Sequence, residues 1–309
     1  AEKYADYFLA HGGQIPYRRY SQLTDFIIDN RLPANARVGI VGDWGTGRPE
    51  ALAVLKQLAG THPDIAVHLG DIYYSGTEYE VDTYFYQEWK SALGDLAAGG
   101  KTFALSGNHE MFCGGAPYYR LIDRLGQPAS YFCLRNEHWQ IIGIDTGLHD
   151  HDPLRGKPTY LEDSEAAWLR HKLDNAGGRR TILLSHHQLF TSKEDIGGQA
   201  INQKLYQQLQ SCLPEVDLWL WGHEHDLVIY KNYLRVLGRC VGHGAFPVAL
   251  DELPSEPRFP NVPTEPVTLG NDGLIYSHGY ATIVLDGPSA TIRYWQDSTP
   301  ATPLFEEKI

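Results

Sequence analysis

Five short polar clusters in this 309-residue chain carry the residue types that bind metal ions. Each follows an apolar run of strand length and contains Asp, Asn or His: Gly42-Asp43-Trp44-Gly45, Gly70-Asp71, Ser106-Gly107-Asn108-His109-Glu110, Ser185-His186-His187 and Gly222-His223-Glu224-His225. Carboxylates and imidazoles together suit Zn, Mn or Fe better than they suit Ca or a thiolate-bound metal. Glycines beside these residues let the chain turn sharply and leave room at the strand ends.

The elements that must position these clusters follow from the hydrophobic pattern. Apolar runs of strand length lie at Val38–Val41, Ile65–Leu69, Phe103–Leu105, Gln140–Ile144, Thr181–Leu184 and Leu218–Trp221. Segments with helical periodicity lie between most of them, at 49–60, 165–173 and 203–210. This alternation predicts an α/β fold with helices on the faces of a sheet. Ligands bind outside the carboxyl ends of strands in such sheets, so we expect the five clusters to converge.

Each cluster taken alone also has a purely structural interpretation. An Asp after a glycine is common in a turn, and the pair His186-His187 could be one buried and one surface histidine. His223 and His225 are two positions apart and would share one side of an extended chain, which lets both reach inward. Five such clusters at strand ends favour a common metal site over five unrelated turns.

The two ends of the chain differ from this pattern. Residues 1–36 mix aromatic and polar positions and suggest an N-terminal helical arm, with 37–309 as a single domain. The proline-rich segment 251–266 predicts a long loop. After it, two antiparallel strands are expected, joined through Asp286-Gly287.

Composition restricts the class of partner. The formal net charge is −12, so attraction to a nucleic-acid polymer or an anionic membrane is not expected. No apolar run approaches the ~18 residues of a membrane span, so we expect a soluble protein. The first thirty residues lack the pattern of a signal peptide. The four cysteines contain no C-x-x-C pair, which argues against a zinc knuckle.

Five motifs of this chain resemble, in the same order, those of the calcineurin-like metallophosphoesterases. They are GDWG, GDIYY, GNHE, LLSH and GHEH. The stretch GD-x-x-Y resembles the purple acid phosphatase branch, in which a tyrosine binds ferric iron. This resemblance runs from Asp43 to His225. It implies a four-layer α/β/β/α sandwich of two mixed sheets, and a small phosphate ester as substrate.

The resemblance also implies a set of metal ligands. The first metal would take Asp43, Tyr74 and His225, because Tyr74 is the third residue after Asp71. The second metal would take Asn108, His186 and His223, and Asp71 would bridge the two.

A phenolate ligand at neutral pH needs a strongly acidic cation, because the phenol has a reference pKa of ~10. The implied cofactors are therefore Fe(III) with a divalent Fe, Zn or Mn ion, with two divalent ions as the alternative.

The implied activity is that of a phosphomonoesterase. Two metals ~3.5–4 Å apart can clamp a phosphoryl group and acidify a water that attacks it. His109 would contact the phosphate or protonate the leaving oxygen, and it could orient Asp43 as well. Asn108 and His187 are further candidate substrate contacts, and Glu110 and Glu224 are expected to orient ligand rings.

Two alternatives remain. One is a phosphodiesterase, including a cyclic-nucleotide phosphodiesterase, with two divalent ions. The other is a non-catalytic scaffold of the same fold, which ranks low because every matched position is filled.

The chain departs from the family in one place. Small purple acid phosphatases carry a further substrate-contacting histidine downstream of the fourth motif, whereas residues 190–195 contain none. Lys193, His149 and His151 are candidates to replace it.

Overall fold

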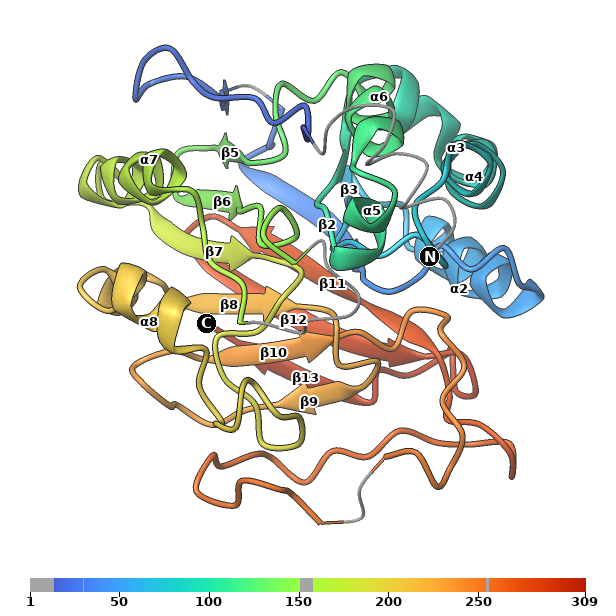
Figure 1. Cartoon of the computed structure of the whole chain (residues 1–309). Coiled ribbons are helices and arrows are strands. Elements are labelled where there is room, and N and C mark those ends of the chain that lie inside the picture. The colour runs from blue at the N-terminus through green and yellow to red at the C-terminus, as the bar shows by residue number, and fades with distance from the viewer. Residues whose placement is uncertain (1–13, 30, 151–157, 254–255) are drawn as a thin grey trace.

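Two β-sheets form the centre of the computed structural model, which describes residues 14–29, 31–150, 158–253 and 256–309 (Figure 1). The seven-stranded sheet has the order β1 (Ile27–Asp29), β5 (Phe132–Arg135), β6 (Trp139–Gly143), β7 (Arg180–Leu184), β8 (Leu218–Trp221), β10 (Gly238–Val241) and β9 (Leu227–Ile229). The six-stranded sheet has the order β13 (Phe305–Lys308), β12 (Ser289–Gln296), β11 (Gly279–Asp286), β2 (Asn35–Val41), β3 (Ile65–His68) and β4 (Thr102–Ala104).

Both sheets are mixed. Strands β2, β3 and β4 run parallel to one another, as do β6, β7 and β8. Strand β11 is antiparallel to both β2 and β12, and it places Ile283 beside Val38 in one pair and beside Ile292 in the other. The antiparallel pair predicted near the end of the chain is therefore confirmed. The six apolar runs named from the sequence all form strands.

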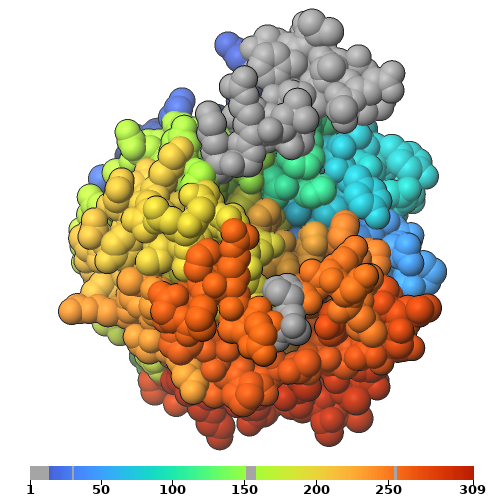
Figure 2. Space-filling view, turned by 60° about the horizontal axis from the view of Figure 1, so that its bottom comes forward, coloured from blue at the N-terminus to red at the C-terminus, as the bar shows by residue number. Residues whose placement is uncertain are grey.

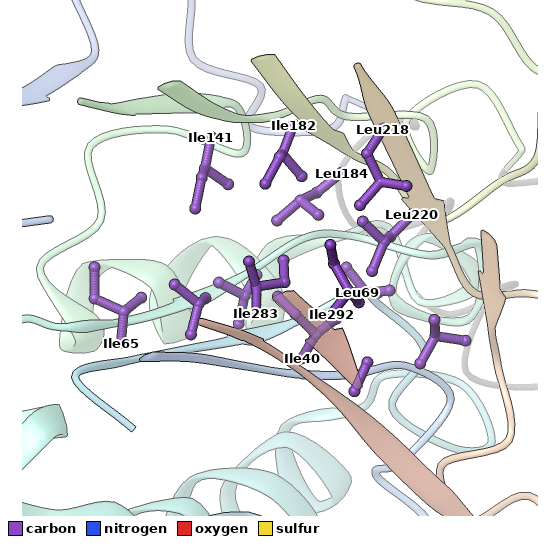
Figure 3. Close-up of a cluster of buried hydrophobic side chains, with 14 of the residues drawn as sticks. Ile40, Ile65, Leu69, Ile141, Ile182, Leu184, Leu218, Leu220, Ile283 and Ile292 are labelled. Carbon is purple, nitrogen blue, oxygen red and sulfur yellow. The ribbon is translucent and has the colours of Figure 1, made fainter. Parts of the chain in front are cut away.

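The main hydrophobic core lies between the two sheets (Figure 3). Ile40 and Ile65 come from the six-stranded sheet, and Ile182 and Leu220 come from the seven-stranded sheet. All four side chains are fully buried. Burial of each such side chain contributes ~1.5–3 kcal/mol relative to exposure, so this layer fixes how the two sheets face each other.

Helices cover the outer faces of the sheets (Figure 1). Helices α2 (Pro49–Gly60), α4 (Gln87–Ala98) and α6 (Ala116–Leu125) share a buried cluster with the six-stranded sheet. Helices α7 (Asp163–Asp174) and α8 (Gln203–Leu209) share another with the seven-stranded sheet. This arrangement confirms the predicted α/β/β/α sandwich with two mixed sheets. The shorter helical elements are α3 (Glu78–Glu80), the π-helix η1 (Val81–Tyr86), α5 (Asn108–Phe112) and the 3₁₀ helix η2 (Leu213–Glu215).

The expected helical arm over residues 1–36 is wrong for its described part. Residues 14–29 and 31–36 form turns and strands without a helix, and β2 already begins at Asn35. Strand β1 pairs in parallel with β5, where Ile27 lies beside Cys133. The Tyr17 ring stacks on Tyr131 at 5.7 Å between centroids. The aromatic residues of this segment therefore serve to pack it against the sheet.

The proline-rich segment behaves as predicted over its described residues, 251–253 and 256–266. These residues contain no helix or named strand, and Thr264 forms an isolated bridge with Tyr230. In Figure 2 the orange part of the chain spreads over the face turned toward the viewer. The segment therefore runs along the edge of the seven-stranded sheet beside β9, where Lys231 N donates to Pro263 O at 2.9 Å.

Candidate metal centre

The five polar clusters converge at one end of the two sheets. Asp43 follows β2, Asp71 follows β3, Asn108 follows β4, His186 follows β7 and His223 follows β8. Backbone hydrogen bonds tie neighbouring clusters together: Asp43 N donates to Gly70 O at 3.0 Å, and Gly222 N donates to His186 O at 2.9 Å. Because each sheet contributes the carboxyl ends of parallel strands, the site lies where the two sheets meet.

One set of four polar atoms, the first donor group, gathers around the Tyr73 hydroxyl. This hydroxyl lies 2.9 Å from Asp43 Oδ1, 2.9 Å from His225 Nε2 and 3.2 Å from Asp71 Oδ2. His225 Nε2 lies 3.5 Å from Asp43 Oδ1. The first donor group therefore consists of two carboxylate oxygens, one phenol and one imidazole.

A second set of four atoms, the second donor group, gathers around His186. Its Nε2 lies 3.2 Å from Asn108 Oδ1, 3.2 Å from His223 Nδ1 and 3.4 Å from Asp71 Oδ1. Asp71 therefore has Oδ2 in the first donor group and Oδ1 in the second, so that one carboxylate joins the two groups.

The spacing within both groups fits metal coordination. Ligand atoms bound at ~2.1 Å to one cation are separated by about 3.0 Å in octahedral and 3.4 Å in tetrahedral geometry. The separations in the two donor groups run from 2.9 to 3.5 Å. The clusters Asp43, Asp71, His186 and His186, His187, His223 each hold potential ligand atoms within 4.8 Å of one another. The residues present therefore fit a centre of two metal ions.

The tyrosine in the first donor group differs from the one expected. Tyr74 is 54% exposed, and its ring contacts are with Tyr73 and Phe246. Tyr73 is fully buried and supplies the hydroxyl. The assignment of Tyr74 came from counting positions in a motif, whereas the backbone after Asp71 turns the side chain one residue earlier into the site.

Backbone hydrogen bonds set the orientation of two imidazoles. His186 Nδ1 lies 3.1 Å from Leu69 O, and His109 Nδ1 lies 2.8 Å from Tyr74 O. A carbonyl oxygen can only accept, so Nδ1 carries the hydrogen in each ring and donates it. In both residues Nε2 then faces the donor groups, as is usual for a metal-site histidine held by an outer partner.

The backbone is strained at the same positions. Asp43, Asp71, His223 and His225 have φ values of 56°, 72°, 70° and 48°. Non-glycine residues in this left-handed region cost of order 1–3 kcal/mol each, and they persist where the surrounding structure requires them. Four such residues in one site indicate that the fold tolerates a loss of stability in order to orient these side chains.

Two glycines allow the carboxylates to sit close to the backbone. A Cβ at Gly107 would lie 2.0 Å from Asp71 Oδ1, and a Cβ at Gly222 would lie 2.4 Å from Asp43 Oδ2. Both distances are far shorter than a van der Waals contact. The glycines predicted to leave room at the strand ends therefore do so against the carboxylates of the site.

A family model for calcineurin-like phosphoesterases matches residues 36–227, which contain every residue of the two donor groups. The chain belongs to this family. It is a metallophosphoesterase domain with a candidate site for two metal ions. No curated protein sequence matches the chain significantly.

Solved structures of distant sequence share the metallophosphoesterase fold. GAP50, described as the anchor in the inner membrane complex of Plasmodium, has a TM-score of 0.59 and 16% identity over 89% of this chain and 88% of its own. The purple acid phosphatase PPD1 from yellow lupin (Lupinus luteus) seeds has a TM-score of 0.58 and 17% identity. That match covers 89% of this chain and 53% of the lupin chain. A dimetal phosphatase from Danio rerio has a TM-score of 0.55 and 14% identity over 89% of this chain and 98% of its own. These likenesses establish the fold.

The charges of this metallophosphoesterase site also call for cations. Burial, and then the nearby Asp71, raise the pKa of Asp43 to about 8. Burial and the two carboxylates raise the pKa of the Tyr73 phenol well above its usual value. Against its own burial, His186 has its pKa raised to about 10 by Asp71, so it takes up the positive charge. The Asp43 carboxyl and the Tyr73 phenol therefore lack nearby positive charge, which metal ions would supply. Despite its burial, Asp71 differs, because His109 and His186 hold the pKa of its carboxyl well below the usual value.

The two glutamates near the metallophosphoesterase motifs orient backbone rather than imidazole rings. Glu110 Oε2 accepts from Gly107 N at 2.7 Å and from Asp71 N at 3.1 Å. Glu224 accepts from Trp221 Nε1 at 3.0 Å, on the core side of the loop. Their predicted role as ring partners is corrected: each fixes the loop that carries ligands.

The remaining predicted site residues lie around the donor groups. His109 Nε2 is 3.7 Å from Asp71 Oδ2, so the carboxylate beside it is that of Asp71 rather than Asp43. His187 Nε2 is 3.0 Å from Asp150 Oδ2, and both residues line a cavity of about 140 Å³ next to His223.

The residues expected to replace the missing histidine are engaged elsewhere. Lys193 Nζ pairs with Asp226, and His149 Nε2 lies 2.9 Å from Glu162 Oε1. His151 lies outside the described residues.

Among the described helices, none combines the length and the apolar character needed to cross a membrane.

Proposed function

We propose that this protein is a phosphoric ester hydrolase with a dinuclear centre of the purple acid phosphatase type. The observation that carries the proposal is the position of Asp71, whose two carboxylate oxygens lie in two different donor groups. A single carboxylate shared in this way can bridge two metal ions ~3.5–4 Å apart, the spacing of two-metal phosphatase sites.

Tyr73 supports a ferric ion in the first donor group. Its phenol is buried beside two carboxylates, which raise its pKa well above the usual value, so only a strongly acidic cation would hold it as phenolate. Asp43, Asp71 and a Tyr73 phenolate carry three negative charges, fewer than the charge of one ferric and one divalent ion. The centre would therefore be locally positive within an acidic chain, which favours a phosphate ester as substrate.

The proposed roles of the side chains follow from their positions. Asp43, Tyr73, His225 and Asp71 would hold the first ion, and Asn108, His186, His223 and Asp71 the second. When bound, the two ions would supply the Lewis acidity that activates water and polarises the phosphoryl group. His109 directs Nε2 toward the shared carboxylate Asp71, so it can donate a hydrogen bond to the phosphate or a proton to the leaving oxygen. His187 borders the cavity beside the second donor group and is a candidate contact to the ester.

A phosphodiesterase with two divalent ions is the second candidate. It is favoured by two ion pairs, that of Lys193 with Asp226 and that of His149 with Glu162. Because of these pairs, neither Lys193 nor His149 adds uncompensated positive charge near the site. A phosphodiester carries one negative charge fewer than a fully ionised monoester, so it needs less cationic help from side chains. Cyclic nucleotides belong to this second class of substrate.

Hydrolysis of two model esters tests the proposal. Protein reconstituted with iron and zinc should cleave p-nitrophenyl phosphate faster than bis-p-nitrophenyl phosphate, and a reversed ratio supports the diesterase. Metal analysis and a visible spectrum should show two metals per chain and a phenolate-to-iron band. Fully metal-loaded protein that leaves both esters intact would reject hydrolysis and favour a scaffold of the same fold.

A further inference from the structure

Three aromatic rings meet beside the first donor group. The ring centroid of Tyr73 lies 5.6 Å from that of Tyr74 and 4.9 Å from that of Phe246, and the Tyr74 and Phe246 centroids are 6.1 Å apart. The hydroxyl of Tyr73 is part of the donor group. The rings of Tyr74 and Phe246 therefore stand one aromatic side chain away from the proposed first metal.

Tyr74 presents its ring to solvent on a fixed backbone. It is 54% exposed, yet its N–H donates to Glu80 Oε1 at 2.7 Å and its carbonyl oxygen accepts from His109 Nδ1 at 2.8 Å. Glu80 Oε2 also accepts from Thr77 N at 2.8 Å, which closes the capping box of α3. The exposure of the ring is thus held by specific contacts to a catalytic-site histidine and a helix cap.

The ring of Phe246 lies beside that of Tyr74 and is also held by specific contacts. Its ring stacks on the His225 imidazole with centroids 4.1 Å apart and planes inclined by 21°. Its N–H donates to Asp43 O at 3.2 Å, so two residues of the first donor group fix its position. The ring planes of Tyr74 and Phe246 are inclined by 73°, so the two rings meet edge-to-face and form an aromatic corner.

We propose that Tyr74 and Phe246 form an aromatic corner that binds the alcohol portion of the substrate, and that the preferred esters are aryl phosphates. This proposal rests on the proposed function, because it places the phosphoryl group at the donor groups. A planar ring attached to the phosphate oxygen can stack on one wall and meet the other edge-to-face, the geometry that aromatic pairs prefer. An alkyl ester of the same charge has no such contact.

Binding of two phosphonates to metal-loaded protein tests the aromatic corner without turnover. Isothermal titration calorimetry should show tighter binding of phenylphosphonate than of methylphosphonate to protein reconstituted with iron and zinc. Tyr74→Ala should weaken phenylphosphonate binding about tenfold, the change that ~1.4 kcal/mol produces, and should leave methylphosphonate binding unchanged. Tyr74→Phe should keep the preference, because it retains the ring.

Tyr79→Ala is the matched control, since Tyr79 is 64% exposed and its ring contact is with Tyr84. It should bind both phosphonates as the unchanged protein does. Three results would overturn the aromatic corner. They are equal binding of the two phosphonates, binding of neither phosphonate, and an equal loss of affinity for both phosphonates in Tyr74→Ala. Protein that prefers phenylphosphonate but hydrolyses neither model ester would overturn the proposed function and keep only the binding of aromatic ligands by the corner, so the two failures are distinct.

Discussion

The hydroxyl of Tyr73 lies 2.9 Å from Nε2 of His225, although 152 positions separate the two residues. The same hydroxyl is 2.9 Å from Asp43 Oδ1, so three separate motifs meet at one phenol oxygen. This relationship supports the proposal that Tyr73 rather than Tyr74 is the tyrosine ligand, and several of the proposed roles can be tested from it.

Removal of the Tyr73 hydroxyl should abolish the colour of iron-loaded protein. Tyr73→Phe keeps the ring packing against Phe246 and His109 but cannot form a phenolate. We expect the visible absorption band of the unchanged protein to disappear while iron still binds through the other ligands. Tyr74→Phe is the control and should keep the band. Loss of colour in Tyr74→Phe alone would restore the assignment made from the sequence.

Asp71→Asn should disrupt both metal positions. An amide offers a single acceptor oxygen and cannot place one in each donor group. We expect loss of at least half of the bound metal by elemental analysis, and a fall in kcat of more than ~100-fold, the upper end of what an outer-shell partner costs. Asp95→Asn changes an exposed carboxylate on α4 and should alter neither. Full metal content in Asp71→Asn would contradict the bridging role.

His109→Asn should separate chemistry from metal binding. General acid–base groups contribute about 10²- to 10⁴-fold, so kcat should fall by that factor with p-nitrophenyl phosphate. The metal content should stay unchanged, because the His109 ring packs on Tyr73 and approaches Asp71 to 3.7 Å but supplies no atom of either donor group. A variant that loses metal in proportion to activity would make His109 a structural residue.

Gly107→Ala should damage the site through a single added methyl group. The new Cβ would lie 2.0 Å from Asp71 Oδ1, so the carboxylate or the loop must move. We expect a stability loss of ~1–3 kcal/mol in urea unfolding, as for other overpacked positions, together with weaker metal binding. At Gly94 an added Cβ meets nothing within 4 Å. Gly94→Ala should therefore be neutral or gain ~0.5–1 kcal/mol, since alanine suits a helix better than glycine.

His243 should make the metal-free protein sensitive to acid. Burial lowers its pKa from 6.5 to about 4, partly offset by the Trp295 carbonyl, while the nearby His278 lowers it further. The unfolded chain binds a proton at His243 below pH ~6.5 and the folded chain does so only near pH 4, so stability falls as pH drops through this window. The full shift corresponds to about 3 kcal/mol at 1.36 kcal/mol per unit.

His243→Gln removes this titration and keeps a side-chain donor for Trp295 O, which lies 3.0 Å from His243 Nε2. Urea unfolding of the metal-free proteins at pH 7.5 and 4 should show a smaller acid-induced loss in the variant. Equal losses in the two proteins would show that His243 does not carry this dependence.

Much of the architecture could be predicted because the relevant signals are local. The apolar run Thr181–Leu184 predicts a buried strand, and the periodic segment 49–60 predicts a helix with one buried face. Both segments form the expected elements. The short strands β1 and β9, with three residues each, were not expected, although each lies in a short apolar run, Phe26–Ile28 and Leu227–Tyr230. Tyr17 and Phe26 belong to the segment expected to be helical, but they lie outside any helix and their rings pack against Tyr131, just before β5.

The sequence alone determined which motifs form the site, because each ligand type directly follows a strand whose apolar character is visible in the chain. It could not determine which of two adjacent tyrosines points inward, since that depends on the backbone path after Asp71. Tertiary structure decided this choice, along with the sharing of Asp71 and the aromatic corner of Tyr74 and Phe246. These features arise only when two sheets pack together and bring side-chain atoms from distant loops within about 3 Å, the spacing at which donor atoms can share a cation.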